Sequence, residues 1–206
     1  FTILNDSTIK AIVNDGSSGV VNVTSAAGSS LKGYFIYENT GCWNTAAMIS
    51  GQNNTHAVKN DGTLWGWGYN GDGNLGDGTN TSRIYPTQVG AYKKWRYIEH
   101  KGYQHTLAIR EDSTLWGWGT STHGELGDGV TVSNYPNMSP IQIGADRNWQ
   151  AVSCGKNHSV AIKTDGTLWA WGDNSFGQLG DGTNVNKNLP IRIGNDSDWQ
   201  SISAGD

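Results

Sequence analysis

Histidine recurs along this chain at a spacing that could suggest a metal site. We interpret His56, His105 and His158 as sharing one position of a repeated pattern. Imidazole is a common zinc ligand, but a structural zinc site needs four ligands close together. One histidine per repeat cannot supply a local cluster, and Phe1 takes the histidine position at the start of the chain. We therefore expect structural histidines, each hydrogen-bonded within its own repeat, and no metal site.

An acidic residue also recurs, within Leu-Gly-Asp-Gly, at Asp77, Asp128 and Asp181. Calcium takes six to eight oxygen ligands, commonly from several carboxylates, whereas each of these loops offers one. An aspartate that accepts hydrogen bonds from its own turn explains the position better. The glycine-rich loops also lack the Gly-Lys-Ser/Thr sequence and the following helix of a phosphate-binding loop. The pattern therefore predicts turns and no calcium or nucleotide site.

No set of residues in the sequence indicates catalysis. A nucleophile and its base should interrupt the repeat, and no Ser/His/Asp or Cys/His set does so. Cys42 and Cys154 are the only cysteines, and neither lies in a Cys-x-x-Cys or Cys/His spacing. We expect buried thiols in preference to a disulfide. The sequence therefore predicts a protein that is not an enzyme, without catalytic, metal-binding or cofactor-binding residues.

Charge and hydropathy exclude two classes of partner. The net charge is −4, and the densest basic run, residues 93–96, is too short for the lysine and arginine stripe that binds phosphates. No apolar run approaches the roughly 18 residues of a membrane-spanning segment. We therefore expect neither direct nucleic-acid binding nor a membrane span.

The composition also bears on location. Only 16% of the residues are charged, against roughly 25% in an ordinary globular domain, and Asn, Thr and Gly are abundant. Such a composition is typical of secreted, surface-exposed or virion β-proteins, so we expect an extracellular or virion location, with the cytoplasm as the alternative. The chain opens on Phe1, so a processed chain or a piece of a longer protein is expected.

The ten tryptophans reveal the organisation that positions these residues. They fall into two series, Trp-x-Trp pairs spaced by 51 and 53 residues and single tryptophans spaced by 52, 54 and 50. The pairs are Trp65/Trp67, Trp116/Trp118 and Trp169/Trp171, and the single residues are Trp43, Trp95, Trp149 and Trp199. Self-similarity at a period near 50 residues indicates a repeat architecture.

The first forty residues are interpreted as a degenerate copy of the same repeat. Residues 1–9 match residues 56–64 in phase, with Lys10 and Ile12 where the tryptophan pair would stand. The chain is therefore read as one propeller segment, 1–206, whose last residues fall just short of the next histidine position. Its four units are expected at 1–55, 56–104, 105–157 and 158–206.

Each unit is expected to contain four short strands. In the second unit, residues 56–59 and 63–68 flank Asp61-Gly62, a strong hairpin signal. A turn-rich loop follows, then a strand entered by proline, and a last strand that begins at a single tryptophan. The proline strands are expected at 86–90, 140–144 and 190–194, and the last strands at Trp95, Trp149 and Trp199. Four strands per 50 residues predict an all-β fold built from propeller blades.

These motifs resemble the regulator of chromosome condensation (RCC1-like) repeat family. The likeness is clearest from Gly155-Lys156-Asn157-His158-Ser159 through Trp169-Ala170-Trp171-Gly172 to Gly177-Gln178-Leu179-Gly180. It covers residues 43–206 well and 1–42 weakly, and the Leu-Gly-Asp-Gly-Thr endings look most like bacterial and bacteriophage members. The resemblance implies a β-propeller, usually of seven blades. Four units do not close such a ring, so we expect either further blades, or self-association or partners that cover the exposed ends.

The loops beside the repeated motifs vary most, and loops on a rigid scaffold commonly carry recognition. His123, Tyr135 and Phe176 are therefore the candidate binding residues, although they could equally be ordinary loop residues. The leading hypothesis is a non-enzymatic scaffold that binds a protein or a cell-surface or virion component. The alternative, implied by the family, is a regulator or inhibitor of one protein target, acting like a GTPase exchange factor or a secreted enzyme inhibitor.

Overall fold

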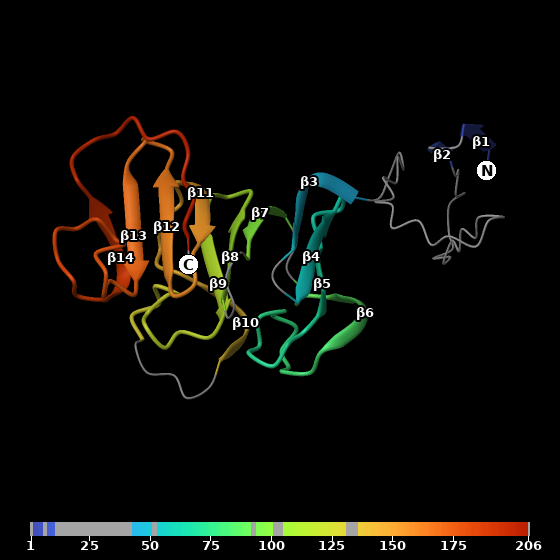
Figure 1. Cartoon of the computed structure of the whole chain (residues 1–206), viewed down its shortest axis with the longest axis horizontal. Helices are drawn as coiled ribbons and strands as arrows, with labels where there is room; N and C mark the ends of the chain where they lie inside the picture. Colours follow the sequence, from blue (N-terminus) through green and yellow to red (C-terminus); the bar gives the residue numbers. More distant parts are fainter. Residues whose placement is uncertain are drawn as a thin grey trace. The chain divides into compact units, whose positions relative to one another are not determined.

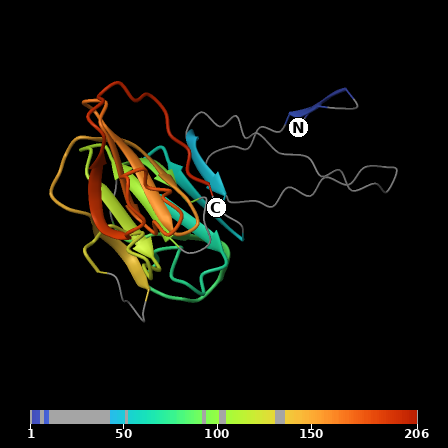
Figure 2. The same cartoon turned by 60° about the vertical axis from the view of Figure 1, so that its left-hand side comes forward.

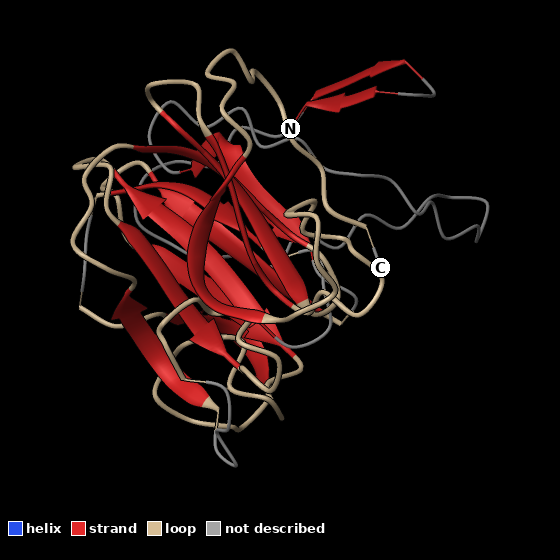
Figure 3. Cartoon of the chain, turned by 90° about the vertical axis from the view of Figure 1, so that its left-hand side faces the viewer, coloured by secondary structure: helices blue, strands red, loops and turns tan. Residues whose placement is uncertain are grey.

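The computed structural model describes the backbone of residues 2–5, 8–10, 43–50, 53–91, 94–100, 105–130 and 136–205. The chain divides into two compact units, residues 1–42 and 43–206, and each is described by itself. Every regular element among the described residues is a β-strand, as the colours of Figure 3 show. The all-β class predicted from the sequence is confirmed.

The strands of the larger unit form three antiparallel sheets of four strands, ordered along the chain (Figures 1 and 2). The first sheet contains β3 (Trp43–Ser50), β4 (Asn54–Lys59), β5 (Leu64–Gly68) and β6 (Arg83–Gln88). The second contains β7 (Trp95–Glu99), β8 (His105–Arg110), β9 (Leu115–Gly119) and β10 (Asn137–Gln142). The third contains β11 (Trp149–Cys154), β12 (His158–Lys163), β13 (Leu168–Gly172) and β14 (Lys187–Ile193). Each sheet is thus a four-stranded propeller blade.

The hairpin between the second and third strands explains why Asp-x-Thr-x-Trp repeats. In the first sheet Asp61 Oδ1 accepts from the backbone N–H and the hydroxyl of Thr63, at 3.0 and 2.6 Å. The Thr63 hydroxyl accepts in turn from the indole of Trp65 at 2.9 Å. The third turn residue needs a positive φ, which is 77° at Gly62 and 59° at Ser113. The second sheet therefore keeps the turn although serine replaces the glycine.

The outer strand of each sheet begins earlier than the sequence predicts. Pro86, Pro140 and Pro190 were expected as first residues, but each is the fourth residue of its strand. The pairing of the outer strand shifts register around this point, for example between Gly66 and Gly68. Proline has no N–H to contribute to a ladder, so an outermost strand with an irregular register tolerates it.

The strand that begins with a single tryptophan is the first strand of its sheet. β7 pairs with β8 and β11 with β12, so each sheet groups this strand with the hairpin that follows it. The sequence units were counted from the strand that contains the histidine, which is the second strand of each sheet. They therefore describe the period of the chain, but each unit begins one strand later than the corresponding sheet. At Trp199 the expected strand is absent from the described residues, because 194–205 contains no strand.

The smaller unit contains one hairpin, formed by β1 (Thr2–Asn5) and β2 (Thr8–Lys10). Its pairs Thr2↔Lys10 and Ile3↔Ile9 correspond, in the sequence alignment of the two hairpins, to the pairs Ala57↔Trp65 and Val58↔Leu64. That this hairpin and the remainder of residues 1–55 form a degenerate copy of the repeat is still a proposal.

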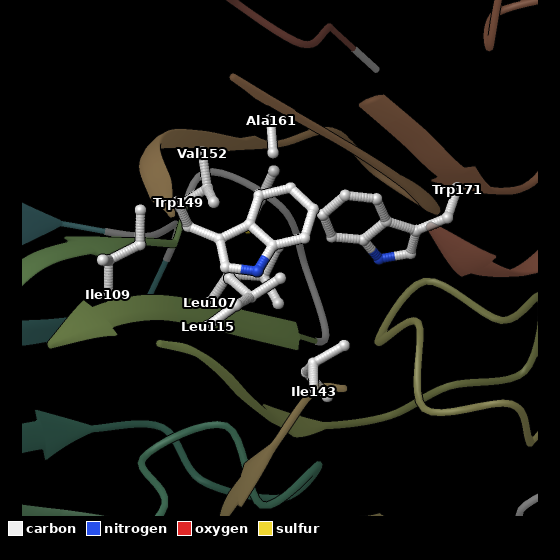
Figure 4. Packing of buried hydrophobic residues seen from close by; sticks show 9 residues of the cluster. Leu107, Ile109, Leu115, Ile143, Trp149, Val152, Ala161 and Trp171 are labelled. Carbon is white, nitrogen blue, oxygen red and sulfur yellow. The ribbon is translucent and has the colours of Figure 1, made fainter. Parts of the chain in front are cut away.

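The core lies between neighbouring sheets and is built around tryptophan. Trp149 packs edge-to-face against Trp169 and Trp171, with ring centroids 5.8 and 6.1 Å apart. Leucine and isoleucine side chains of the second sheet complete the cluster, including Leu115 and Ile143 (Figure 4). Burial of one tryptophan removes roughly 150–250 Å² from water, or about 4–6 kcal/mol gross at about 25 cal/mol per Å². Tryptophan therefore supplies much of the apolar area that joins the sheets.

Candidate binding surface and the interfaces between sheets

The interface between the first and second sheets converges on one backbone carbonyl. The Thr106 hydroxyl and the Trp118 indole N–H both donate to the carbonyl oxygen of Asn74, at 2.9 Å each. Asn74 belongs to the Gly-Asn-Leu-Gly loop after β5. In that loop, a Cβ built on Gly76 would lie 2.7 Å from Trp118 Nε1. Glycine is therefore required here by the close approach of the indole.

The interface between the second and third sheets repeats this arrangement. Ser159 and Trp171 both donate to the carbonyl oxygen of Glu125, at 2.8 Å each. A Cβ on Gly127 would lie 2.8 Å from Trp171 Nε1. The repeated glycines and tryptophans therefore form the interfaces between sheets and are not an active-site loop.

A second contact secures the outer edge of each interface. The loop of one sheet lies on the outer strand of the next, so Gly78 N–H donates to the carbonyl of Met138 at 2.7 Å. Gly129 N–H donates equivalently to the carbonyl of Asn188 at 2.8 Å. The Asn188 side chain donates back to Gly129 O at 2.7 Å. The Gly-Asp-Gly segment thus serves as backbone contact between sheets.

The interpretation that three histidines share one position is wrong. His105 and His158 lie opposite the last glycine of the next strand, whereas Asn54 occupies that position in the first sheet. His56 lies two residues further along, opposite Gly66. A shift of two residues keeps a side chain on the same face of a strand, so histidine is accommodated at either position.

The buried histidines have structural partners, but not always within their own sheet. His56 Nε2 lies 3.3 Å from the carbonyl of Leu75, as expected for a bond within one blade. His105 Nε2 instead lies 3.0 Å from the hydroxyl of Ser159 in the third sheet. Since that hydroxyl donates its proton to the carbonyl of Glu125, we assign the proton of this contact to His105 Nε2.

His100, which sequence reasoning missed, joins the same buried network. Its Nδ1 lies 2.9 Å from the carbonyl of His105 and 2.8 Å from the hydroxyl of Thr106. Burial lowers the pKa of His100 to about 4 and the pKa of His56 and His105 to about 3 each. These three side chains are therefore neutral at physiological pH, which suits them to packing and not to proton transfer.

The aspartates of the Leu-Gly-Asp-Gly loops bond within their own turns, as predicted. Asp181 accepts from the backbone and the hydroxyl of Thr183, at 2.9 and 2.8 Å, and from the side chain of Asn174. The hydrogen bonds from Thr183 hold the pKa of Asp181 well below its usual range. Lys187 pairs with the second carboxylate oxygen at 3.1 Å. Among the described residues, no three His, Cys, Asp or Glu side chains are placed to hold a metal ion.

The loop of the second sheet is built differently from the loops of its neighbours. Asn70 and Asn174 each anchor their loop by donating to an aspartate and to two backbone carbonyls. Ser121 replaces them in the second sheet and reaches only Leu126 N–H, at 3.3 Å. The carboxylate of the fully buried Glu125 accepts from the backbone N–H groups of residues 122 and 123, and in the third sheet the Gln178 side chain accepts from the equivalent N–H of Phe176. Burial raises the pKa of this carboxyl group.

The loops after the third strands lie at one end of the sheets, and the hairpins lie at the other end. We call the described residues of these loops, 69–82, 120–130 with 136, and 173–186, the loop surface. His123 lies in it, half-buried, with its Nδ1 3.0 Å from the hydroxyl of Thr122. Phe176 also lies in it and is 92% exposed. Tyr135, the third candidate, lies outside the described residues.

The structure places the two described candidates on neighbouring loops. Burial acts to raise the pKa of Asp173, at the start of the next loop, but hydrogen bonds from Ser175 and Gln178 lower this pKa, and the nearby His123 adds to the lowering. Sequence reasoning did not single out Tyr69 and Val185, which are also exposed on the loop surface. The signal was available for Tyr69, since it opens the variable segment that contains His123 and Phe176 in the other sheets. No helix among the described residues is long and apolar enough to span a bilayer.

Comparison with solved structures shows the same fold. Prp20p from Saccharomyces cerevisiae, described with its binding to Gsp1p and histones, aligns with a TM-score of 0.64 and 23% identity, over 72% of this chain and 38% of that protein. The same yeast protein bound to Kap60 aligns with a TM-score of 0.69 and 20% identity, over 79% and 40%. These neighbours establish a propeller of four-stranded blades.

Sequence comparison finds longer relatives. The ultraviolet-B receptor UVR8 of Arabidopsis thaliana is 31% identical over 69% of this chain and 44% of its own length. The mitochondrial RCC1 domain-containing protein RUG3 of the same plant is 33% identical over 61% and 28%. The chain thus spans less than half the length of these relatives. The model of the regulator of chromosome condensation (RCC1) repeat matches residues 61–109, 112–162 and 165–206. The chain therefore belongs to the RCC1 repeat family.

Proposed function

We propose that this chain is a non-enzymatic propeller scaffold that binds another protein through its loop surface. The proposal is supported by the division of labour within each repeat. The indoles of Trp118 and Trp171 and the ring of His105 are used between sheets, and the recurring aspartates are used within turns. The variable loop positions carry exposed side chains that these contacts do not use, among them Phe176.

The exposure of Phe176 carries the proposal. A phenylalanine left 92% exposed is not used to stabilise its own loop, which Asn174 and Asp181 already hold by hydrogen bonds. Aromatic side chains are enriched where proteins bind one another, because they bury a large area at a small entropic cost. Tyr69 and Val185 extend the exposed apolar area onto other parts of the loop surface.

Site-specific photo-crosslinking tests this proposal. A photo-reactive amino acid at position 176 should form covalent adducts with a protein partner in extracts of the source cells. The matched control is position 164, which is exposed on a hairpin at the opposite end of the strands. The proposal predicts adducts at 176 and none at 164. Equal adducts at both positions, or turnover of a small molecule that is lost when the loop is changed, would contradict it.

The alternative function is regulation or inhibition of one protein target. The yeast neighbour is described with its binding to Gsp1p and histones, which gives a GTPase as a concrete case. A regulator must change the activity of its target and not merely bind it. Nucleotide exchange on a small GTPase, or residual activity of a secreted hydrolase, measured with and without the chain, separates the two functions.

A narrower form of the proposal concerns location. The low content of charged residues and the abundance of Asn, Thr and Gly support attachment outside the cell or on a virion, in a bacterial or bacteriophage setting. The complete reading frame and its neighbouring genes test this directly. Structural virion genes on either side would support it, whereas a conserved intracellular pathway around the gene would favour the cytoplasm.

A further inference from the structure

Each interface between sheets is formed by two different halves. The strand half supplies a hydroxyl on the second strand, an indole on the third strand and the outer strand, as Thr106 and Trp118 do with β10. The loop half supplies the Gly-x-Leu-Gly-Asp-Gly segment, whose central carbonyl accepts both hydrogen bonds. The second sheet presents its strand half to the first sheet and its loop half to the third.

The first sheet carries a strand half that no described residue covers. Thr55 and Trp67 are directly opposite one another in β4 and β5, in the register of Thr106 and Trp118. Both are only half-buried, whereas their counterparts are fully buried. On the outer strand, Ile84 is 86% exposed. Among the described residues, the indole N–H of Trp67 has no acceptor.

The third sheet carries a loop half that is open in the same way. Gln178 aligns with the residues whose carbonyls accept the paired hydrogen bonds in the other sheets, and no described residue donates to its carbonyl. A Cβ on Gly180 would meet only Ile193 Cγ2, at 3.7 Å. Its counterpart Gly127 lies against the indole of Trp171. No described residue therefore fills the position that an indole would occupy at this end.

We propose that the strand half of the first sheet in one copy docks on the loop half of the third sheet in a second copy. We choose a second copy as the partner because the two interfaces within the chain each join a strand half to a loop half. The first sheet has an uncovered strand half and the third sheet has an open loop half, so two copies can form the same kind of interface. Trp67 would donate to the carbonyl of Gln178, and the Gly182 N–H to the carbonyl of Ile84. Such a contact joins two different surfaces, so it produces closed rings or open chains of copies.

The segment after β14 competes with this docking. The backbone N–H of Trp199 donates to the carbonyl of Gly166 at 3.2 Å, just as the backbone N–H of Trp149 donates to the carbonyl of Ser113. Residues 199–205 therefore follow the path of the first strand of an incoming sheet, but they form no strand, and Trp199 is 42% exposed. The first strand of the second copy takes the place of this segment, so weakening its anchor promotes association.

Sedimentation velocity of the full chain over about a hundredfold range of concentration tests the proposal, because association by mass action depends on concentration. Two matched glycine variants identify the loop half. Gly180→Asn fills the indole position and is expected to abolish association, whereas Gly194→Asn is expected to leave it unchanged. Both glycines have a positive φ, 71° and 65°, which asparagine tolerates. Gly194 lies outside the Gly-x-Leu-Gly-Asp-Gly segment, and neither it nor its counterpart Gly144 has a neighbour within 4 Å of a Cβ at that position.

A mixing experiment establishes that the two ends differ. The double variant Thr55→Val and Trp67→Phe removes both donors of the strand half, so its self-association should weaken by about thirtyfold or more. Mixed with Gly180→Asn, it should form dimers, because one intact strand half and one intact loop half remain. Trp199→Pro, which removes the backbone N–H that donates to the carbonyl of Gly166, should strengthen association of the otherwise unchanged chain. Thermal unfolding of each variant alone confirms that it is folded.

The proposal would be overturned by a chain that stays monomeric over the whole concentration range. It would equally be overturned if the two glycine variants weakened association to the same extent, or if the mixture formed no dimer. Association that persists in the mixture as large, polydisperse aggregates would also contradict it, since capped ends permit only pairs.

Discussion

β5 and β9 have the identical sequence Leu-Trp-Gly-Trp-Gly, but their surroundings differ. Every residue of β9 is buried, whereas both tryptophans of β5 are only half-buried. The second sheet lies between two others, and its Trp118 meets the carbonyl of Asn74. No described sheet covers the corresponding face of the first. The comparison shows that the motif determines the strand and the hairpin, while the neighbouring sheet determines how much each tryptophan contributes to the stability of the fold.

The largest expected effect comes from truncation of the buried tryptophan. Trp118→Ala should lower the free energy of unfolding by about 3–5 kcal/mol, because it opens a cavity and leaves a buried carbonyl short of a donor. Trp67→Ala removes the identical side chain from the half-buried position and should cost about half as much. Urea unfolding monitored by circular dichroism measures both. Equal losses would show that the interface does not distinguish the two strands.

The buried histidines sharpen the comparison through pH. The folded pKa of His105 is about 3, below the ordinary value of 6.5, so the unfolded chain binds the proton first. The stability associated with neutral His105 is therefore complete above about pH 6.5 and is lost as the pH falls toward the folded pKa. Each such histidine should cost about 2 kcal/mol between pH 6.5 and pH 5.

His105→Asn provides the test, because Asn54 occupies the same position in the first sheet. Between pH 7 and pH 5 this variant should lose about 2 kcal/mol less stability than the unchanged chain. Urea unfolding at the two pH values gives the difference. A variant whose pH dependence matches that of the unchanged chain would show that His105 is not held neutral.

A pair of glycine substitutions separates backbone strain from packing. Gly127→Ala and Gly182→Ala both place a Cβ at a positive φ, 77° and 79°, which costs about 1 kcal/mol in either case. Only Gly127 lies against an indole, so its substitution should cost a further 1–3 kcal/mol, roughly, from overpacking. Thermal unfolding compares them. Equal changes in melting temperature would show that the nearby indole does not require glycine at position 127.

The smallest effect on stability is expected on the loop surface. Phe176→Ala should change the free energy of unfolding by less than about 0.5 kcal/mol, since its side chain is almost entirely exposed. The same substitution should weaken capture of a protein partner. A large loss of stability would place Phe176 in the fold and not in recognition.

Much of the fold could be predicted because the repeat reports local structure several times over. The hairpins follow from Asp-Gly and Asp-Ser turns, and the tryptophan period correctly indicates four-stranded sheets with tryptophan between them. The position of Pro86 was wrong because an outer strand with an irregular register tolerates proline in its interior. The histidine position was wrong because residue type was matched without the register of the paired strands.

The interfaces could not be predicted in detail because their acceptors are backbone atoms. The carbonyls of Asn74 and Glu125 carry no side-chain signature, and the same loop position holds Asn, Glu or Gln in the three sheets. The side chain at that position, Glu125 or Gln178, likewise bonds to backbone N–H groups of its own loop. Of the candidate binding residues, His123 and Phe176 are placed on the loop surface, but their role in binding is still a proposal.

The most direct test of this account replaces the indole without opening a large cavity. Trp118→Phe removes the N–H that bonds to Asn74, and Trp67→Phe makes the same change in β5, where no described acceptor is present. The account predicts a loss of about 1–3 kcal/mol of unfolding free energy for the first variant and a few tenths, roughly, for the second. Equal losses from the two substitutions would contradict the claim that the repeated tryptophans act as hydrogen-bonded contacts between sheets.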